Sequence, residues 1–287
     1  MKKKVLGMLI VTMTGMLIAC SSESEPKETV GGAPAETVGT SLGSNESDTT
    51  EQQTKDNTND LDSLSDEYLL SLPETSPDDF MYEENDEGGI RIEGYLGERT
   101  EDTIIVIPAQ IDGKDVTEIR KEAFIRFYGK AIVTGKNVKT IGEGAFTSCN
   151  VKKILINGPV TQIVENTFII ADVEEVKLPD TLEEIGNGAF TSCQLKTIEI
   201  PSSVTLIAGG SFCLSKLEEV YIKGEEVNVE STAFGSMSAL KKVYVTSGNV
   251  NFDEGAFYLT EDVTIVAPAG SKAEEFAKAN GINIENN

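Results

Sequence analysis

The sequence contains no histidine and no tryptophan, and aromatic residues make up only 6% of its 287 positions. Without histidine the chain cannot build a Ser-His-Asp or Cys-His catalytic group, and it lacks the commonest metal ligand. Cys149, Cys193 and Cys213 do not have the Cys-x-x-Cys spacing of a zinc site, and no dense calcium-binding loop occurs. We therefore expect a protein that is not an enzyme and that holds no metal and no cofactor.

Basic residues are scarce, since 24 lysines and arginines face 48 aspartates and glutamates, which gives a formal net charge of −24. A nucleic-acid partner requires a basic stripe that contacts phosphates, and the sequence has none. We therefore expect no nucleic-acid partner, and we assign the acidity to solubility. One catalytic alternative is a glycosidase-like carboxylate pair, but nothing selects one pair among the 35 acidic residues beyond residue 77.

An uninterrupted apolar run of the roughly 20 residues that span a bilayer is also missing. Three lysines at positions 2–4 precede a shorter apolar run over residues 5–19, which predicts a secretory signal peptide at 1–19. The end of this run, LIAC at residues 17–20, resembles the lipobox of bacterial lipoproteins. That resemblance implies a lipid on Cys20, with the mature chain anchored to the membrane outside the cytoplasm and exposed at the cell surface. The alternative is an ordinary signal peptide followed by an unrelated cysteine.

Residues 20–77 differ in composition from the rest of the chain. They are rich in Ser, Thr, Glu, Asp, Gly and Asn, and from residue 21 they hold 13 acidic residues against two lysines. Such a segment buries too little apolar surface to offset the entropy of ordering it, so we predict a disordered acidic tether. The stretch LLSL at residues 69–72 has two interpretations, a docking segment or a transient apolar cluster, and we favour the cluster.

A repeat of 22 residues dominates the remaining sequence. Phenylalanine recurs at intervals of 22, 22, 22, 22, 22 and 23 residues, at Phe124, Phe146, Phe168, Phe190, Phe212, Phe234 and Phe257. An apolar residue precedes each of them by five positions, from Ile119 to Phe252. One such unit cannot bury its own apolar side chains, so we interpret the units as stacked coils of a solenoid. The seven phenylalanines should then form a continuous internal column.

The pattern within each unit predicts its local structure. An alternating, β-branched stretch such as residues 197–200, TIEI, predicts a short strand with one buried face, and Pro201 ends it. Gly142 and Gly186 suit a turn that requires either a positive φ or a close backbone approach. The GAFTSC segment that follows each of them suits one tight helical turn.

The best-preserved unit, residues 182–201, reads LEEIGNGAFTSCQLKTIEIP. It resembles the BspA-type leucine-rich repeats of bacterial surface proteins, and the resemblance extends over roughly residues 80–287. It implies a β-rich solenoid of about seven 22-residue coils, each a strand and a helical turn, with a function in adhesion. We expect an N-terminal β cap at residues 78–115, coils at 116–262 and a C-terminal cap at 263–287. The short helix of the last cap should begin with a capping box of Ser271 and Glu274.

The three cysteines of the repeats have two interpretations. Cys149 and Cys193 occupy the same position two coils apart, which places them about 10 Å from each other, beyond disulfide reach. Cys193 and Cys213 lie in adjacent coils at offset positions. They form either a disulfide or two buried thiols that act as small apolar side chains.

The outward position between the buried residues of each strand offers a candidate binding face. It is occupied in successive coils by Val133, Leu155, Lys177, Glu199, Tyr221 and Tyr244. Tyrosine supplies contact area at low entropic cost, which favours recognition, although the two tyrosines could simply pack on each other. We expect a non-catalytic module that binds or adheres to an extracellular protein or another macromolecule. The alternative is glycan capture by the tyrosine-bearing face.

Overall fold

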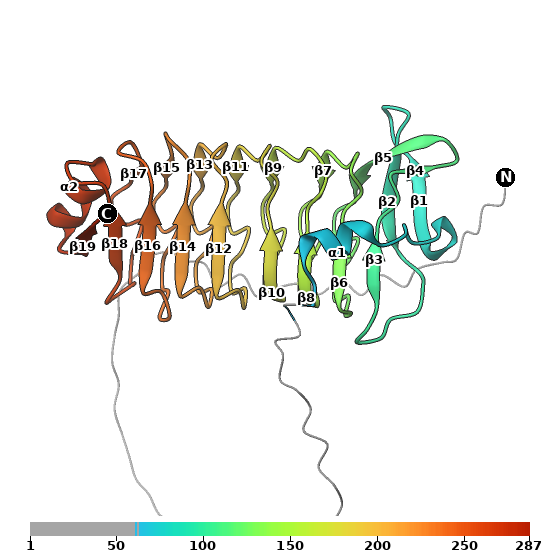
Figure 1. Cartoon of the computed structure of the whole chain (residues 1–287), viewed down its shortest axis with the longest axis horizontal. Helices are drawn as coiled ribbons and strands as arrows, with labels where there is room; N and C mark the ends of the chain where they lie inside the picture. The colour runs from blue at the N-terminus through green and yellow to red at the C-terminus, as the bar shows by residue number, and fades with distance from the viewer. Residues whose placement is uncertain (1–60, 62) are drawn as a thin grey trace, which may run out of the picture. The chain divides into compact units, whose positions relative to one another are not determined.

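The computed structural model describes residues 61 and 63–287, so the predicted signal peptide, Cys20 and most of the predicted tether lie outside the described residues. The described chain begins with a short helix, α1 (Asp66–Ser71), and a single 3₁₀ turn, η1 (Pro77–Asp79). A stack of coils follows and ends at a second helix, α2 (Lys272–Asn280), as Figure 1 shows. Within the described part of the chain, neither helix has the length and apolar character needed to cross a membrane.

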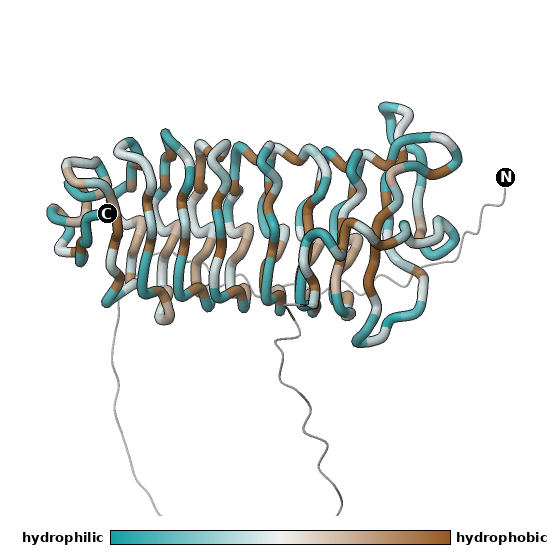
Figure 2. Tube along the Cα trace, in the orientation of Figure 1, coloured by the Kyte–Doolittle hydropathy of each residue, from teal (hydrophilic) through white to brown (hydrophobic). Residues whose placement is uncertain are grey.

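Successive coils contribute strands to one long side of the solenoid, whose outer surface we call the strand face. Four strands form its first parallel sheet, β3 (Ile104–Val106), β6 (Ala131–Val133), β8 (Asn150–Leu155) and β10 (Asp172–Lys177). Five form its second, β12 (Thr197–Ile200), β14 (Glu219–Ile222), β16 (Lys242–Val245), β18 (Thr264–Ala267) and β19 (Asn283–Asn286). Alternation along each strand directs every second side chain into the core, so Figure 2 shows hydrophobic and hydrophilic segments in turn.

Shorter strands line a second side of the coils. Five of them form a parallel sheet, β9 (Gln162–Ile163), β11 (Glu184–Ile185), β13 (Leu206–Ile207), β15 (Asn228–Val229) and β17 (Asn251–Phe252). Their buried members are the apolar residues that precede each phenylalanine by five positions. The stack continues toward the N-terminus through β7 (Thr140–Ile141) and β5 (Lys114–Ile119).

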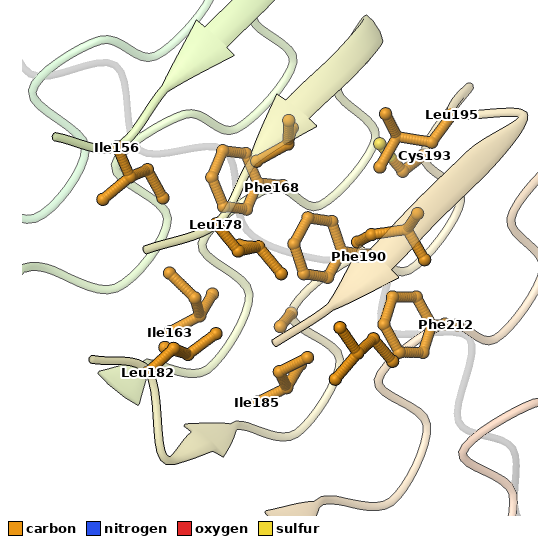
Figure 3. Packing of buried hydrophobic residues seen from close by; sticks show 14 of the residues in the cluster. Ile156, Ile163, Phe168, Leu178, Leu182, Ile185, Phe190, Cys193, Leu195 and Phe212 are labelled. Atoms are coloured by element: carbon orange, nitrogen blue, oxygen red, sulfur yellow. The ribbon is translucent and has the colours of Figure 1, made fainter. Parts of the chain in front are cut away.

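The seven predicted phenylalanines lie in one buried stack along the core. Neighbouring ring centroids are 4.8 to 5.6 Å apart, and the ring planes differ by 6° to 20°. Figure 3 shows Phe168, Phe190 and Phe212 among the aliphatic side chains of the strands on either side. The Phe146 N–H donates to the carbonyl of Thr167 in the next coil, and the same bond recurs from coil to coil. The rings and the backbone therefore fix one common spacing.

Glycine serves two different needs in the turn that carries each phenylalanine. A Cβ added to Gly142 would lie 2.4 Å from the Lys121 nitrogen, so this position requires close approach of two coils. Positive φ falls two residues later, at Gly144 (62°) and Gly188 (61°). A second left-handed residue follows two positions after each phenylalanine, at Ser148 (53°) in this coil. Each phenylalanine turn is therefore bounded by a left-handed residue at both ends.

The ends of the solenoid extend the stack further than the repeat pattern predicts. In the segment expected as an N-terminal cap, β1 (Phe80–Glu84) pairs antiparallel with β2 (Ile90–Tyr95), and β4 (Gln110–Ile111) pairs antiparallel with β5. However, β2 already pairs parallel with β5, and β3 with β6. At the other end, β18 and β19 add two strands of the same parallel sheet within residues 263–287.

Helix α2 closes the C-terminal end. The Ser271 hydroxyl accepts a hydrogen bond from the Glu274 N–H at 3.1 Å, and Gly281 ends the helix in the left-handed region. The Glu274 carboxylate in turn accepts a hydrogen bond from the N–H of Gly270, one residue before the N-cap. The Phe276 ring lies 5.3 Å from Phe252, so the helix covers the last phenylalanines of the core.

Cys149, Cys193 and Cys213 are buried, and none of the three forms a disulfide in the part of the chain that the structure describes. Burial raises the pKa of Cys149 and of Cys193 to about 12, so both thiols stay protonated at neutral pH. Of the two interpretations offered by the sequence, the structure shows buried thiols acting as small apolar side chains.

Replacing Phe168 by Ala should lower the free energy of unfolding by about 3 to 5 kcal/mol, because it removes a fully buried ring that stacks on two neighbours. Urea melts of the two proteins measure the difference. Leu96→Ala is the control, since this side chain is 65% exposed and its loss should change stability by less than about 0.5 kcal/mol. A Phe168→Ala loss as small as the control's would contradict the assigned core.

Acid should weaken the C-terminal cap. Hydrogen bonds from Lys278, Gly270 and Asn286 hold the pKa of Glu274 at about 2. An unfolded glutamate titrates near pH 4.3, so this stabilisation is fully present above about pH 4.3 and is lost as the pH falls toward 2. The protection factors of the α2 amides, which correct for the intrinsic pH dependence of exchange, should fall across that window. Glu274→Gln should abolish this pH dependence of the α2 protection factors, and an unchanged profile in that variant would count against this carboxylate.

Candidate binding surface

The strand face brings the predicted outward residues into register, with one interruption. Direct cross-strand pairs join Val133 to Leu155 and Leu155 to Lys177 in the first sheet. In the second sheet, Tyr221 pairs with both Glu199 and Tyr244. Among the described strands, β10 pairs only with β8 and β12 only with β14, so no ladder joins Lys177 to Glu199. The face therefore has two parts.

The first part is covered by the segment that precedes η1. Residues 63–76, which we call the strap, place α1 across β6 and β8 (Figure 1). Leu64 and Leu69 are buried against Ala131, Val133 and Leu155. Ser65 caps the helix, because its hydroxyl accepts a hydrogen bond from the Tyr68 N–H. Val133 and Leu155 are thus 1% and 5% exposed, which removes them from the candidate binding face.

A buried ion pair and backbone hydrogen bonds fix the strap. The Lys153 ammonium, on β8, lies 2.6 Å from Asp66 of α1 and 2.8 Å from Glu175 of β10. Burial by itself lowers the pKa of Lys153, but the hydrogen bonds to these two carboxylates outweigh it and raise the pKa above its ordinary value. Farther along, the Thr75 N–H donates to the Val106 carbonyl at 2.9 Å, and the Val106 N–H donates to the Thr75 hydroxyl.

The prediction of a disordered tether up to residue 77 is therefore wrong for the strap. The leucines of the strap cannot form a core by themselves, but they pack on the apolar outer surface of the first sheet, which Ala131, Val133 and Leu155 form. Of the two interpretations of LLSL, the structure shows the docking segment, with Leu69 fully buried and Leu70 51% exposed. Lys153 was not singled out from the sequence. Its neighbours are the signal in the sequence that could have identified it. Lys153 is an outward-facing lysine of a strand, and the nearest outward residues, Ala131 and Leu155, are apolar.

The second part of the face remains accessible. Tyr221 and Tyr244 are half-buried, and their rings stack with centroids 4.6 Å apart and planes 2° apart. The Tyr221 hydroxyl donates to Glu219, a hydrogen bond that raises the pKa of Tyr221 to about 12. Each ring covers one face of the other, so the pair exposes ring edges and one free face at each end. The tyrosines therefore pack on each other and also keep a contact surface.

A pocket marks the interruption between β10 and β12. It has a volume of about 260 Å³, and its walls include Lys177, Glu199 and Lys223. Glu199 accepts a hydrogen bond from Lys223 at 2.7 Å, which lowers the pKa of Glu199. At its base Val176 and Ile198 are 6% and 3% exposed, whereas the equivalent Ile154 in the preceding coil is fully buried. The polar residues of the predicted face thus line a shallow hollow.

The part of the chain that the structure describes contains no group of three or more His, Cys, Asp or Glu side chains suited to a metal ion. The pocket at the interruption combines two lysines with carboxylates that are paired or exposed. Its geometry supports recognition of a polar surface.

Residues 103–213 and 165–273 match the BspA type leucine rich repeat region, with six copies. The chain belongs to the BspA-type leucine-rich repeat family. The sequence resemblance is therefore confirmed, and the coils described above are BspA-type repeats. No curated protein matches the sequence.

Three solved structures of leucine-rich repeat proteins match the chain. One from T. pallidum is 22% identical with a TM-score of 0.51, and the match covers 74% of this chain and 98% of that chain. One from Bacteroides ovatus is 17% identical with a TM-score of 0.42, covering 75% and 77%. A leucine rich cell surface protein from Faecalibacterium prausnitzii is 16% identical with a TM-score of 0.26, covering 75% and 95%. The likeness to the T. pallidum protein is one of fold alone.

Replacing Leu69 by Ala should release the strap while leaving the BspA-type coils intact, because Leu69 is buried only against the outer surface of the first sheet. Hydrogen exchange measures this through the Thr75 and Val106 amides, which should lose protection, and the Phe146 amide, which should keep it. Leu70→Ala, an identical change at an exposed position of the same helix, is the control. Equal protection of Thr75 in both variants would show that the strap does not depend on Leu69.

Proposed function

We propose that the chain is a bacterial cell-surface lipoprotein whose solenoid binds a protein or another macromolecule without catalysis. Membership of the BspA-type family supports a repeat scaffold used for binding. The signal-like residues 1–19 and the lipobox-like LIAC support export and attachment of a lipid at Cys20, which would anchor the chain to the membrane. Residues 21–62 would then separate the solenoid from that membrane.

The observation that carries the proposal is the stacked pair Tyr221 and Tyr244 on the accessible part of the strand face. The strap covers the apolar part of the same face, so the part left open combines these tyrosines with Lys177 and Glu199. Aromatic side chains at the centre of a patch surrounded by charged groups are typical of protein interfaces. This composition supports recognition of an extracellular protein.

Glycan capture is the second candidate, and the parallel tyrosine rings are the observation that favours it. A sugar stacks on an open ring face, and each ring here covers one face of the other. The pair therefore suits a protein partner better, because ring edges and hydroxyls reach outward from the sheet. Glycan binding is retained as an outcome of the test.

The test uses the full chain against immobilised extracellular-matrix proteins, cell-surface extracts and a glycan array. Tyr221→Ala combined with Tyr244→Ala should weaken protein binding at least tenfold, as loss of central aromatic residues does. Tyr258→Ala is the matched control, since Tyr258 is 51% exposed on the phenylalanine turns, away from the strand face. Tyrosine-dependent binding to the glycan array alone would support glycan capture instead. Binding that survives the double replacement would remove this face from the proposal.

A further inference from the structure

The residue two positions after each phenylalanine forms a row along the turns. From the second coil to the seventh the row consists of Ser148, Ile170, Ser192, Leu214, Ser236 and Leu259. We call these six residues the turn row. Serine and a large aliphatic residue alternate strictly, so the aliphatic side chains recur every second coil, roughly 10 Å apart at the strand spacing of stacked coils. The preceding coil has Arg126 at this position, outside the alternation.

The aliphatic members of the turn row combine two unfavourable properties. Ile170, Leu214 and Leu259 have φ values of 57°, 60° and 55°, in the left-handed region that disfavours bulky and β-branched residues. Their side chains are also 58%, 45% and 67% exposed. Serine occupies the same conformation in the alternate coils, which shows that the fold does not need an aliphatic residue there. Strain combined with exposure points to a contact outside the coil itself.

When the turn row is read in reverse, serines fall where the forward row has aliphatic residues, and aliphatic residues fall where it has serines. If a second copy lies antiparallel across it, Ser192 faces Leu214, Ile170 faces Ser236, and Ser148 faces Leu259. Each aliphatic side chain then meets the small residue of the other copy. A two-fold axis that kept the copies parallel would place serine on serine and leucine on leucine. Of the two symmetric dimers, only the antiparallel one therefore places each aliphatic side chain against a serine.

A second row shows the same complementarity in charge. Lys152, Glu174, Lys196, Glu218 and Lys241 follow the phenylalanine turns of the second to sixth coils. In the seventh coil the strand register places the apolar Val263 beside Lys241, so the charged row ends at Lys241. Within one chain, Lys152 pairs with Glu174, and Lys241 with Glu218. Reversal of this row places Lys196 opposite Glu218 and Glu174 opposite Lys241. Opposite charges therefore face each other at the four central positions of the antiparallel contact.

The two rows lie on one surface. A hollow of about 410 Å³ at the C-terminal end of the turns is lined by Leu259 together with Glu218, Lys241, Glu261 and Asp262. A side chain from a second copy that enters this hollow contacts the apolar and the charged row at once. In the antiparallel arrangement the residue opposite Leu259 is Ser148, and Lys152 lies nearby in the same coil.

We propose that the turn row is a self-association surface, through which two copies of this chain form an antiparallel dimer centred between Ser192 and Leu214. The dimer leaves both strand faces free, because the turns and the strands lie on different sides of each coil. Its formation goes beyond the proposed binding function and does not depend on Tyr221 or Tyr244. Loss of one activity is therefore separable from loss of the other.

Cysteine cross-linking of the full chain tests the register, with Cys20 replaced by Ser in every variant. A mixture of Ser148→Cys and Leu259→Cys chains should give a disulfide-linked dimer under mild oxidation. Neither variant alone should do so, because like positions are five coils apart in the antiparallel dimer, roughly 24 Å at the strand spacing. Ser148→Cys mixed with Ser192→Cys is the control and should not cross-link. Cross-linking of the control, or of a single variant with itself, would overturn the antiparallel register.

Sedimentation velocity over a concentration series tests the interface energetically. Ile170→Ser combined with Leu214→Ser should raise the dimer dissociation constant at least tenfold, because four aliphatic contacts are lost from the symmetric pair. Serine is already present at this conformation in three coils, so the variant should keep its thermal melting behaviour. Leu70→Ser, which removes an exposed leucine from the strap, should leave the dissociation constant unchanged. A protein that stays monomeric at all concentrations, or a double variant that dimerises as tightly as the unmodified chain, would refute the proposal.

Discussion

Stacking of the phenylalanine rings imposes a spacing of 4.8 to 5.6 Å on successive coils, and the rest of the molecule conforms to it. This interval matches the distance between hydrogen-bonded strands, so aromatic contact in the core and backbone pairing at the surface favour the same arrangement. Every position of the repeat therefore becomes a row along the molecule. The turn row and the strand face are two such rows, and both follow from a contact that is hidden from solvent.

The repeat could be predicted because it depends on residues that recur. The interval between Phe146 and Phe168 fixes the coil length, and Ser271 with Glu274 marks the last helix. The interruption between β10 and β12 could not be predicted from that interval, which is 22 residues on both sides. It coincides with a change from Val173, which lies inside its strand, to Leu195, which lies outside it. This change preserves the apolar pattern of the repeat, so the pattern does not reveal the interruption.

The strap was missed for a different reason. Its composition is that of a segment unable to form its own core, and this remains true, because Leu64 and Leu69 are buried only by surface that the first sheet provides. The same contact explains why two of the six residues of the predicted binding face, Val133 and Leu155, are closed. Lys153 makes the first sheet depend on the strap in turn. Its buried ammonium is stable only while the carboxylates of Asp66 and Glu175 stay beside it, and Asp66 belongs to the strap. The accessible tyrosines of the candidate site could therefore be predicted from the repeat, but the closure of its two apolar residues depends on a segment outside the repeat.

The position of the strap also has a mechanical consequence. All residues before it connect to the solenoid through it, so a pull transmitted along the chain from the N-terminal side reaches Leu64 and Leu69 before it reaches the phenylalanine stack. The six-residue helix would peel away under load, and the chain would lengthen by those few residues while the coils stayed folded. Under load the contact between the strap and the first sheet would therefore break first, and it could form again, while the phenylalanine core stayed intact.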